Sequence, residues 1–256
     1  MTRIHKAFEN GKAFIAFLTG GDPDLETTEK LIYAIEEAGA DLIEIGIPFS
    51  DPIAEGVVIQ EADERAMKNG TTTDDLFALV KKVRQNTQIP LVFMTYYNPV
   101  FSYGRDKFMQ NAAEVGIDGL IIPDVPFEES EEVREYTKKY GLELINMIAP
   151  TSIERTKMIA EKSEGFLYCV SSLGVTGVRS EINMNIAKLI KDAKEVTDVP
   201  CAIGFGISTP QQAKEMSQVS DGVIVGSAIV RIIAEHGKDA VPYVKEYVKS
   251  MKDAIR

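Results

Sequence analysis

Glu44 is the residue of this 256-residue chain whose surroundings point most directly to chemistry. It lies in the apolar run at 42–47, which is typical of a buried strand, where a carboxylate is costly unless it is paired or used. Side chains alternate along a strand, so Leu42, Glu44 and Gly46 share one face and three isoleucines the other. If the isoleucines meet helices, burial raises the pKa of Glu44 toward neutral pH, where the group can transfer protons. The alternative is a structural glutamate paired with a nearby donor.

Glycines cluster in three loops late in the chain. They form Gly-Val-Thr-Gly at 174–177, Gly-Phe-Gly at 204–206, and Gly226-Ser227 before an apolar stretch. In α/β barrels, backbone N–H groups of the last loops and of a short helix commonly bind phosphate. The clustering predicts a phosphorylated ligand, although any one glycine can simply turn the chain.

Other polar residues fall where strands are expected to end. Glu55 lies in a Pro- and Gly-broken loop and Asp124 lies between Pro123 and Val125. Alone, the first reads as a solvated charge and the second as a helix cap. Tyr96 and Tyr168 close two further apolar runs, where a tyrosine either packs or offers a polar handle.

Two absences narrow the chemistry. No lysine falls at an expected strand end, which argues against a Schiff-base mechanism because the amine must reach the substrate carbonyl. The two histidines, His5 and His236, lie near the ends of the chain, and catalytic metal sites usually recruit imidazole. We therefore expect no metal site.

The elements that position these residues alternate in type. Strict alternation of strands and helices predicts a parallel sheet, and eight units in this length fit one closed (β/α)8 TIM barrel over residues 1–256, with an extra N-terminal helix at 3–9. A doubly wound open sheet is the alternative, but no Gly-x-Gly-x-x-Gly turn follows the first strand. The expected strands are residues 13–19, 41–47, 90–96, 119–123, 143–148, 165–170, 200–204 and 222–226. The expected helices include residues 27–38, 73–85, 128–140, 152–161, 183–195 and 210–217.

Composition limits the partners. The net charge of −11, without a Lys- or Arg-rich run, argues against nucleic acid and anionic membranes as partners. No apolar run approaches the ~18 residues of a membrane span, and no leader pattern opens the sequence. Cys169 and Cys201 lie in short apolar runs and are expected to be reduced, buried thiols. We expect a cytoplasmic protein.

These motifs together resemble the tryptophan synthase α-subunit family. The most specific is Gly-Ile-Pro-Phe-Ser-Asp-Pro at 46–52, and the resemblance extends over essentially the whole chain. The other matching stretches, in family order, are residues 16–23, 94–99, 123–126, 174–177, 204–206 and 226–227.

The resemblance implies an activity and a set of roles. The family cleaves indole-3-glycerol phosphate to indole and glyceraldehyde 3-phosphate by a retro-aldol reaction in tryptophan biosynthesis. The implied catalytic residues are Glu44, Glu55 and Tyr168. The implied indole contacts are Phe17, Tyr96, Asp124 and Thr176, and the implied phosphate contacts are Gly177, Gly206, Gly226 and Ser227.

The resemblance also implies a partner. The family α chain needs no cofactor of its own and binds a β subunit, which carries pyridoxal phosphate, in an α2β2 complex. By the same resemblance, that partner would be contacted by Asp51, Pro52, Asn98 and Phe101.

Two departures from the family pattern lie in the catalytic loops. Ala54-Glu55-Gly56-Val57 stands where the family usually has Ala-Asp-Gly-Pro, and the residues at 171–173 lack the arginine often found there. The longer Glu55 side chain shifts its carboxylate by about one bond length, enough to misplace a contact. A weakened α-like subunit that mainly binds and activates a β subunit is therefore the alternative, and an unrelated phosphosugar-binding barrel enzyme is a third.

Overall fold

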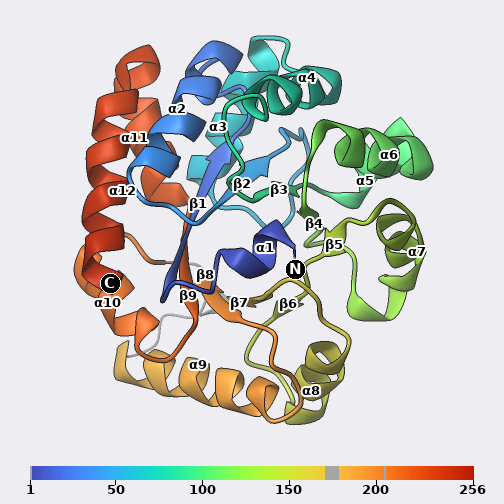
Figure 1. Cartoon of the computed structure of the whole chain (residues 1–256), viewed down its shortest axis with the longest axis vertical. Helices are drawn as coiled ribbons and strands as arrows, with labels where there is room; N and C mark the ends of the chain where they lie inside the picture. The colour runs from blue at the N-terminus through green and yellow to red at the C-terminus, as the bar shows by residue number, and fades with distance from the viewer. Residues whose placement is uncertain (1, 171–178, 205) are drawn as a thin grey trace.

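The computed structural model describes residues 2–170, 179–204 and 206–256 (Figure 1). In this part of the chain nine strands form one parallel sheet. The strands are β1 (Ala13–Thr19), β2 (Leu42–Gly46), β3 (Leu91–Met94), β4 (Gly119–Ile121), β5 (Glu143–Leu144), β6 (Met147–Ile148), β7 (Leu167–Val170), β8 (Cys201–Gly204) and β9 (Gly222–Val225).

The sheet closes on itself through one short segment. Its order is β5-β4-β3-β2-β1-β9-β8-β7-β6, so the two edge strands are consecutive in the chain. Between them, the Ile145 N–H donates to the Leu120 carbonyl at 2.9 Å, and the Asn146 carbonyl accepts the Tyr168 N–H at 3.0 Å. The segment at 143–148, which was expected as one strand, therefore pairs with β4 through β5 and with β7 through β6. The predicted eight-stranded barrel is confirmed.

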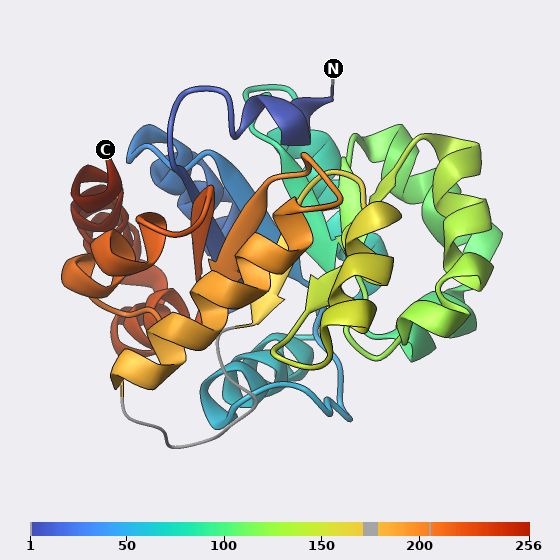
Figure 2. The same ribbon diagram turned by 90° about the horizontal axis from the view of Figure 1, so that it is seen from below.

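Helices surround the barrel (Figures 1 and 2). Over the described residues they are α1 (Arg3–Lys6), α2 (Leu25–Glu37), α3 (Val57–Lys68), α4 (Thr73–Val83), α5 (Tyr97–Tyr103), α6 (Arg105–Val115), α7 (Glu131–Tyr140), α8 (Ile153–Glu161), α9 (Arg179–Lys194), α10 (Pro210–Ser217), α11 (Ser227–His236) and α12 (Val241–Ile255), with 3-10 turns η1 (Phe127–Glu129) and η2 (Gly237–Asp239). The predicted N-terminal helix is present as α1, which lies over the centre of the barrel in Figure 1. No helix in the described part of the chain is long and apolar enough to span a membrane.

Helices α3, α5 and α6 are among those that lie outside the helical segments listed from the sequence. Their N-cap residues, Gly56, Tyr96 and Gly104, make no side-chain capping bond. The Ser, Thr, Asp or Asn that usually marks a helix start in a sequence is therefore missing at all three. The helices are held instead by packing on the barrel.

Two apolar cores confirm the predicted orientation of β2. Ile43, Ile45 and Ile47 belong to the core between the sheet and the helices. Leu42 belongs to the core inside the barrel, with residues such as Val92 and Tyr168. Glu44, which alternates with the isoleucines, therefore points inward. Both cysteines are free and buried, as predicted.

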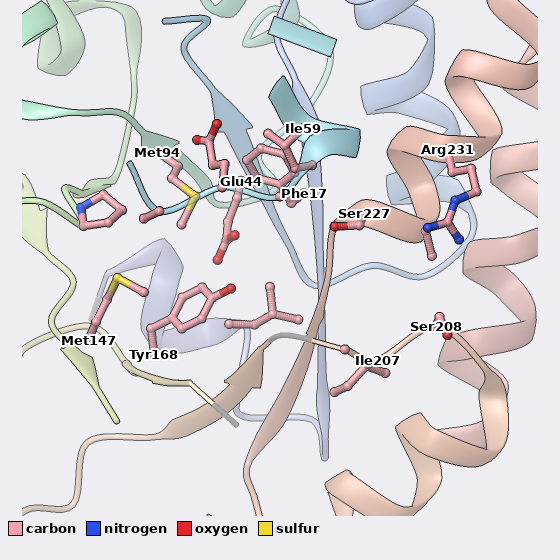
Figure 3. Close-up of a pocket in the computed structure, with 18 of the residues that line it drawn as sticks. Phe17, Glu44, Ile59, Met94, Met147, Tyr168, Ile207, Ser208, Ser227 and Arg231 are labelled. Atoms are coloured by element: carbon pink, nitrogen blue, oxygen red, sulfur yellow. The ribbon is translucent and has the colours of Figure 1, made fainter. Parts of the chain in front are cut away.

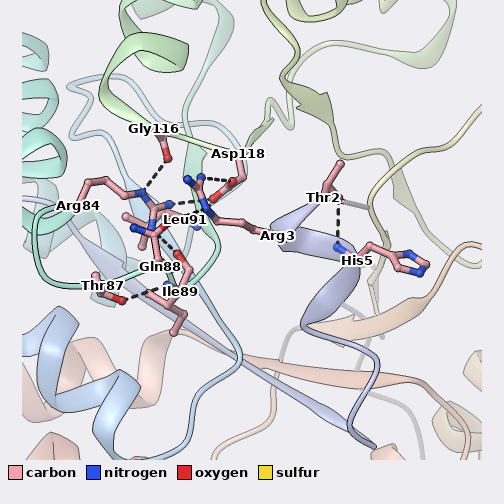
Figure 4. A network of polar contacts seen from close by, with 10 residues as sticks. All are labelled: Thr2, Arg3, His5, Arg84, Thr87, Gln88, Ile89, Leu91, Gly116 and Asp118. Atoms are coloured by element: carbon pink, nitrogen blue, oxygen red, sulfur yellow. Dashed lines mark hydrogen bonds and ion pairs between the residues drawn. The ribbon is translucent and has the colours of Figure 1, made fainter.

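A polar network ties the amino-terminal end of the barrel together (Figure 4). The Asp118 carboxylate accepts bonds from Arg3 Nη1 and Arg84 Nη2, both at 2.8 Å, and from the Leu91 N–H at 2.9 Å. Arg84 also donates to the carbonyl of Gly116 at 2.8 Å. Because the buried charges are paired and hydrogen-bonded, this end of the barrel holds α1 and α4 against the strands.

Candidate active site

A pocket of about 300 Å³ opens at the carboxyl ends of the strands (Figure 3). In Figure 2, α3 (cyan) lies at this end and α1 (dark blue) at the other. The pocket brings together eight of the residues that the sequence singled out. They are Phe17, Glu44, Glu55, Tyr96, Tyr168, Gly206, Gly226 and Ser227.

Glu44 lies buried in the wall of this pocket. Its exposed fraction is 1%, and neither carboxylate oxygen has a hydrogen-bond partner among the described residues. Burial raises the pKa of Glu44 to about 8. The described part of the chain thus offers no donor for the structural pairing considered above. The carboxyl can hold or release a proton near neutral pH.

Tyr168 faces the same space from β7. Figure 3 shows its ring and the Glu44 carboxyl extending toward one another across the pocket. Burial, and next the charge of Glu44, raise the pKa of Tyr168 well above its usual value, so the phenol keeps its proton. The ring fits because residue 204 is glycine: a Cβ there would lie 2.4 Å from the Tyr168 hydroxyl oxygen.

Glu55 approaches the pocket from the loop before α3. Its carboxyl interacts with the side chains of Asp63 and Tyr96, and burial raises its pKa. The Tyr96 hydroxyl also accepts the Ala54 N–H at 2.9 Å, which fastens the loop to the end of β3. The second carboxylate is therefore held by contacts on two sides.

Asp63, a functional candidate that sequence reasoning missed, lies behind Glu55. It is 3% exposed and belongs to the buried face of α3, with Ile59, Ala62 and Ala66. Burial, and next the neighbouring Glu55 charge, raise the pKa of Asp63. An acidic residue on the apolar stripe of a helix was the available signal, but the helix itself was not predicted.

The opposite side of the pocket is suited to an anion. Gly226 is the N-cap of α11, and it makes no side-chain capping bond, so the first N–H groups of that helix remain available. Ser208 and Arg231 line the pocket beside Ser227, and Arg231 follows Ser227 by one helical turn. Sequence reasoning missed Arg231, whose spacing from Ser227 was the available signal. Thr176 and Gly177, the remaining predicted contacts, lie outside the described residues.

Asp124 has a different place from the one expected. It does not line the pocket. Its two carboxylate oxygens accept the Tyr97 N–H at 2.9 and 3.1 Å. This bond satisfies the first residue of α5, so Asp124 stabilises the start of that helix and not of the η1 turn near Phe127.

Large apolar side chains are exposed on the segments that follow β2 and β3. Ile53, Val57 and Phe101 have exposed fractions of 79%, 66% and 59%. Asp51 and Asn98, two of the predicted partner contacts, are exposed nearby in the chain, and Pro52 is half-buried. Exposed apolar groups of this kind commonly mark protein interfaces.

Comparison with known proteins gives one consistent family. The sequence model described as tryptophan synthase alpha chain matches residues 4–256. The tryptophan synthase alpha chain of Thermoanaerobacter sp. (strain X514) is 48% identical over an alignment of 262 positions that covers both chains completely.

Solved structures agree with the sequences. Tryptophan synthase subunit alpha from Legionella pneumophila superposes with a TM-score of 0.91 at 37% identity, covering 100% of this chain and 98% of that one. A chain of the tryptophan synthase complex from Pyrococcus furiosus superposes with a TM-score of 0.85 at 36% identity, covering 95% and 98%. With a family match over nearly its whole length, this chain belongs to the tryptophan synthase alpha chain family.

Proposed function

We propose that this chain cleaves indole-3-glycerol phosphate to indole and glyceraldehyde 3-phosphate by a retro-aldol reaction. The observation that carries the proposal is the buried Glu44 carboxyl, which has no hydrogen-bond partner among the described residues and lies in the wall of the pocket. Membership of the family supports the same activity. A carboxyl buried without a partner costs folding free energy, and groups of this kind are typical of active sites.

Glu44 is the proton-transfer group of the proposed reaction. With a pKa of about 8 it holds a proton at neutral pH and donates it to the indole ring carbon that bears the side chain. The resulting carboxylate takes the proton from the glycerol hydroxyl, and the carbon–carbon bond breaks to give the aldehyde and indole. Tyr168 extends toward Glu44 across the pocket (Figure 3), which supports a place for it beside the reacting atoms.

Glu55 stabilises the charge that develops on the ring. Protonation of the ring carbon makes the indole nitrogen positive, and a carboxylate that accepts its N–H stabilises that state more than the ground state. Asp63 and Tyr96 hold the Glu55 carboxyl at the pocket wall, which supports this role for it.

The pocket offers matching surfaces for the two ends of the substrate. Phe17, Ile59, Met94 and Met147 provide an apolar slot for the indole ring. The N-terminus of α11, with Gly226 and Ser227, offers backbone N–H groups and a positive dipole end for the phosphate. Gly206 lines the same side of the pocket, and Gly177 belongs to this site by resemblance.

We also propose a tryptophan synthase β subunit as the partner of this chain, in an α2β2 complex where the β subunit carries pyridoxal phosphate. The exposed apolar side chains of Ile53, Val57 and Phe101 support this. Ile53 and Val57 flank the pocket-lining residues 54–56 in the chain, and Phe101 lies on α5, which follows the pocket-lining Tyr96. Asp51, Pro52 and Asn98 would contribute polar and backbone contacts at the edge of the same interface.

Indole release tests the activity. The purified chain is mixed with indole-3-glycerol phosphate, with and without a cognate β subunit, and indole is measured over time. We expect turnover by the chain and faster turnover with the partner. If no indole appears above the uncatalysed background while the β reaction accelerates, the chain is a binding and activating subunit and the lyase proposal is wrong.

A further inference from the structure

The Glu55–Asp63 contact places two acidic side chains against each other beside the pocket. Asp63 sits on α3 with an exposed fraction of 3%, and it does not line the pocket, whereas Glu55 does. The two carboxyls interact with one another, and Asp63 also interacts with the Phe49 backbone. Asp63 is therefore held by its buried place on α3 and by its contact with the Phe49 backbone.

A hydrogen bond between two carboxyls requires a proton. Two carboxylates in contact repel one another strongly when both are ionised, so such a pair holds one proton between its members. Oε2 of Glu55 is buried without a hydrogen-bond donor, which leaves it dependent on that proton or on a donor from a ligand. Burial of both groups strengthens the effect.

The neighbouring charges do not neutralise the pair. Arg65, on the same helix, is engaged in two 2.8 Å bonds to the Asp22 carboxylate after β1. Asp22 itself raises the pKa of Asp63 further through its negative charge. Tyr96, after β3, interacts with Glu55 but carries no positive charge. None of these three side chains brings an unpaired positive charge to the pair.

We infer that Asp63 is a positioning residue, which shares one proton with Glu55 and so holds the Glu55 carboxylate in place to accept the N–H of the substrate. The inference rests on the proposed function for the identity of that substrate. It also accounts for a glutamate at this position: the longer side chain has an extra rotatable bond, and a fixed partner removes that freedom.

Three variants test the role in the complete chain. Asp63→Ala removes the partner and should lower kcat about 10-fold to 100-fold, since misplacement of a catalytic group by about 1 Å has this effect. Asp63→Asn should restore kcat to within about threefold of the parent, because its amide donates to Glu55 without needing a proton. Glu61→Gln is the matched control: it removes one exposed charge from the same helix and should leave kcat unchanged.

The pH profile separates this role from a merely structural one. In the parent, kcat/KM should fall at alkaline pH as the pair loses its proton. In Asp63→Asn that step should disappear, whereas the step that belongs to Glu44 should remain, and Glu61→Gln should keep both. Equal activity of Asp63→Ala and the parent would overturn the inference.

Carbon-13 NMR of the labelled chain tests the shared proton without activity. The carboxyl carbons of residues 55 and 63, assigned with Glu55→Gln and Asp63→Asn, should titrate together, with one step well above the usual carboxyl range. Separate titrations of the two carbons at about pH 4 would overturn the inference. If the parent releases no indole but the shared titration is present, the proposed function fails and the proton-sharing pair stands.

Discussion

Buried carboxylates have opposite surroundings at the two ends of the barrel. At the amino-terminal end, Asp118 accepts bonds from two guanidinium groups and one backbone N–H. At the carboxyl end, Glu44 is buried without a partner in the described part of the chain, and Asp63 contacts another acid. Paired charges hold a fold together, whereas unpaired ones cost stability and gain reactivity. The division matches the general separation of stability and catalysis in barrels of this type.

Glu143 shows that the division is one of degree. It lies at the amino-terminal end of the barrel, and burial raises its pKa while its Oε2 lacks a hydrogen-bond partner. Thr2, however, bonds to the same carboxyl. The cost of burying this group is therefore partly offset, unlike that of Glu44, and Glu143 does not line the pocket that holds Tyr168 and Glu55.

The largest expected effect is at the reactive end. Glu44→Gln should lower kcat by about 10³-fold, because the amide can neither protonate the indole ring carbon nor take the proton from the glycerol hydroxyl. Affinity for a phosphate-bearing product analogue should change little, since the anion side of the pocket is intact. Indole release and equilibrium binding measure the two quantities. Activity within a few-fold of the parent would remove Glu44 from the mechanism.

The matching change at the stable end should act on folding. Asp118→Asn leaves Arg3 and Arg84 without their carboxylate and should lower the free energy of unfolding by about 3 kcal/mol. Urea denaturation measures this, with kcat per folded molecule expected to stay near the parent value. A loss of activity without a loss of stability would break the proposed division between the two ends.

A third prediction uses the pH dependence of folding. The pKa of Glu44 is about 8 in the folded chain, against an ordinary value of 4.5, so between these values the folded state binds more protons than the unfolded state. Stability should therefore fall as pH rises from about 5 to 8, at a limiting slope of about 1.4 kcal/mol per pH unit for this one group.

The comparison with Glu44→Gln isolates this contribution from those of other acids. The variant should lose less stability than the parent over the same pH range in urea unfolding. Parallel curves for the two proteins would mean that Glu44 is ionised when folded, and a donor for it would then have to be found.

The smallest effect concerns the start of α3, two residues after Glu55. Val57 is the first residue of α3, a position that favours proline, and Gly56 before it has the extended backbone that a following proline requires (φ −80°, ψ 165°). Val57→Pro should raise the free energy of unfolding by about 0.5 kcal/mol, through a less flexible unfolded chain. Val57→Ala is the control. Destabilisation by proline would show that the helix start needs a backbone that the ring excludes.

Much of the barrel could be predicted from local pattern. The alternation of apolar and polar residues in β2 was enough to place its isoleucines toward the helices and Glu44 inside, as the two cores confirm. Glycines at strand ends likewise marked Gly206 and Gly226 as pocket residues. One group of failures has a single cause. Helices α3, α5 and α6 start without a side-chain cap and were not listed, and with α3 unrecognised, Asp63 could not be placed.

The sequence by itself determined the alternation of strands and helices, the inward direction of Glu44 and the family, because these follow from residue types and spacing along the chain. Only the tertiary structure decided which side chains meet across segments: Glu44 with Tyr168, Glu55 with Asp63, and Asp124 with the start of α5. The physical reason is that a pKa or a hydrogen bond depends on distances of a few ångströms between residues far apart in the chain, and barrel closure sets those distances.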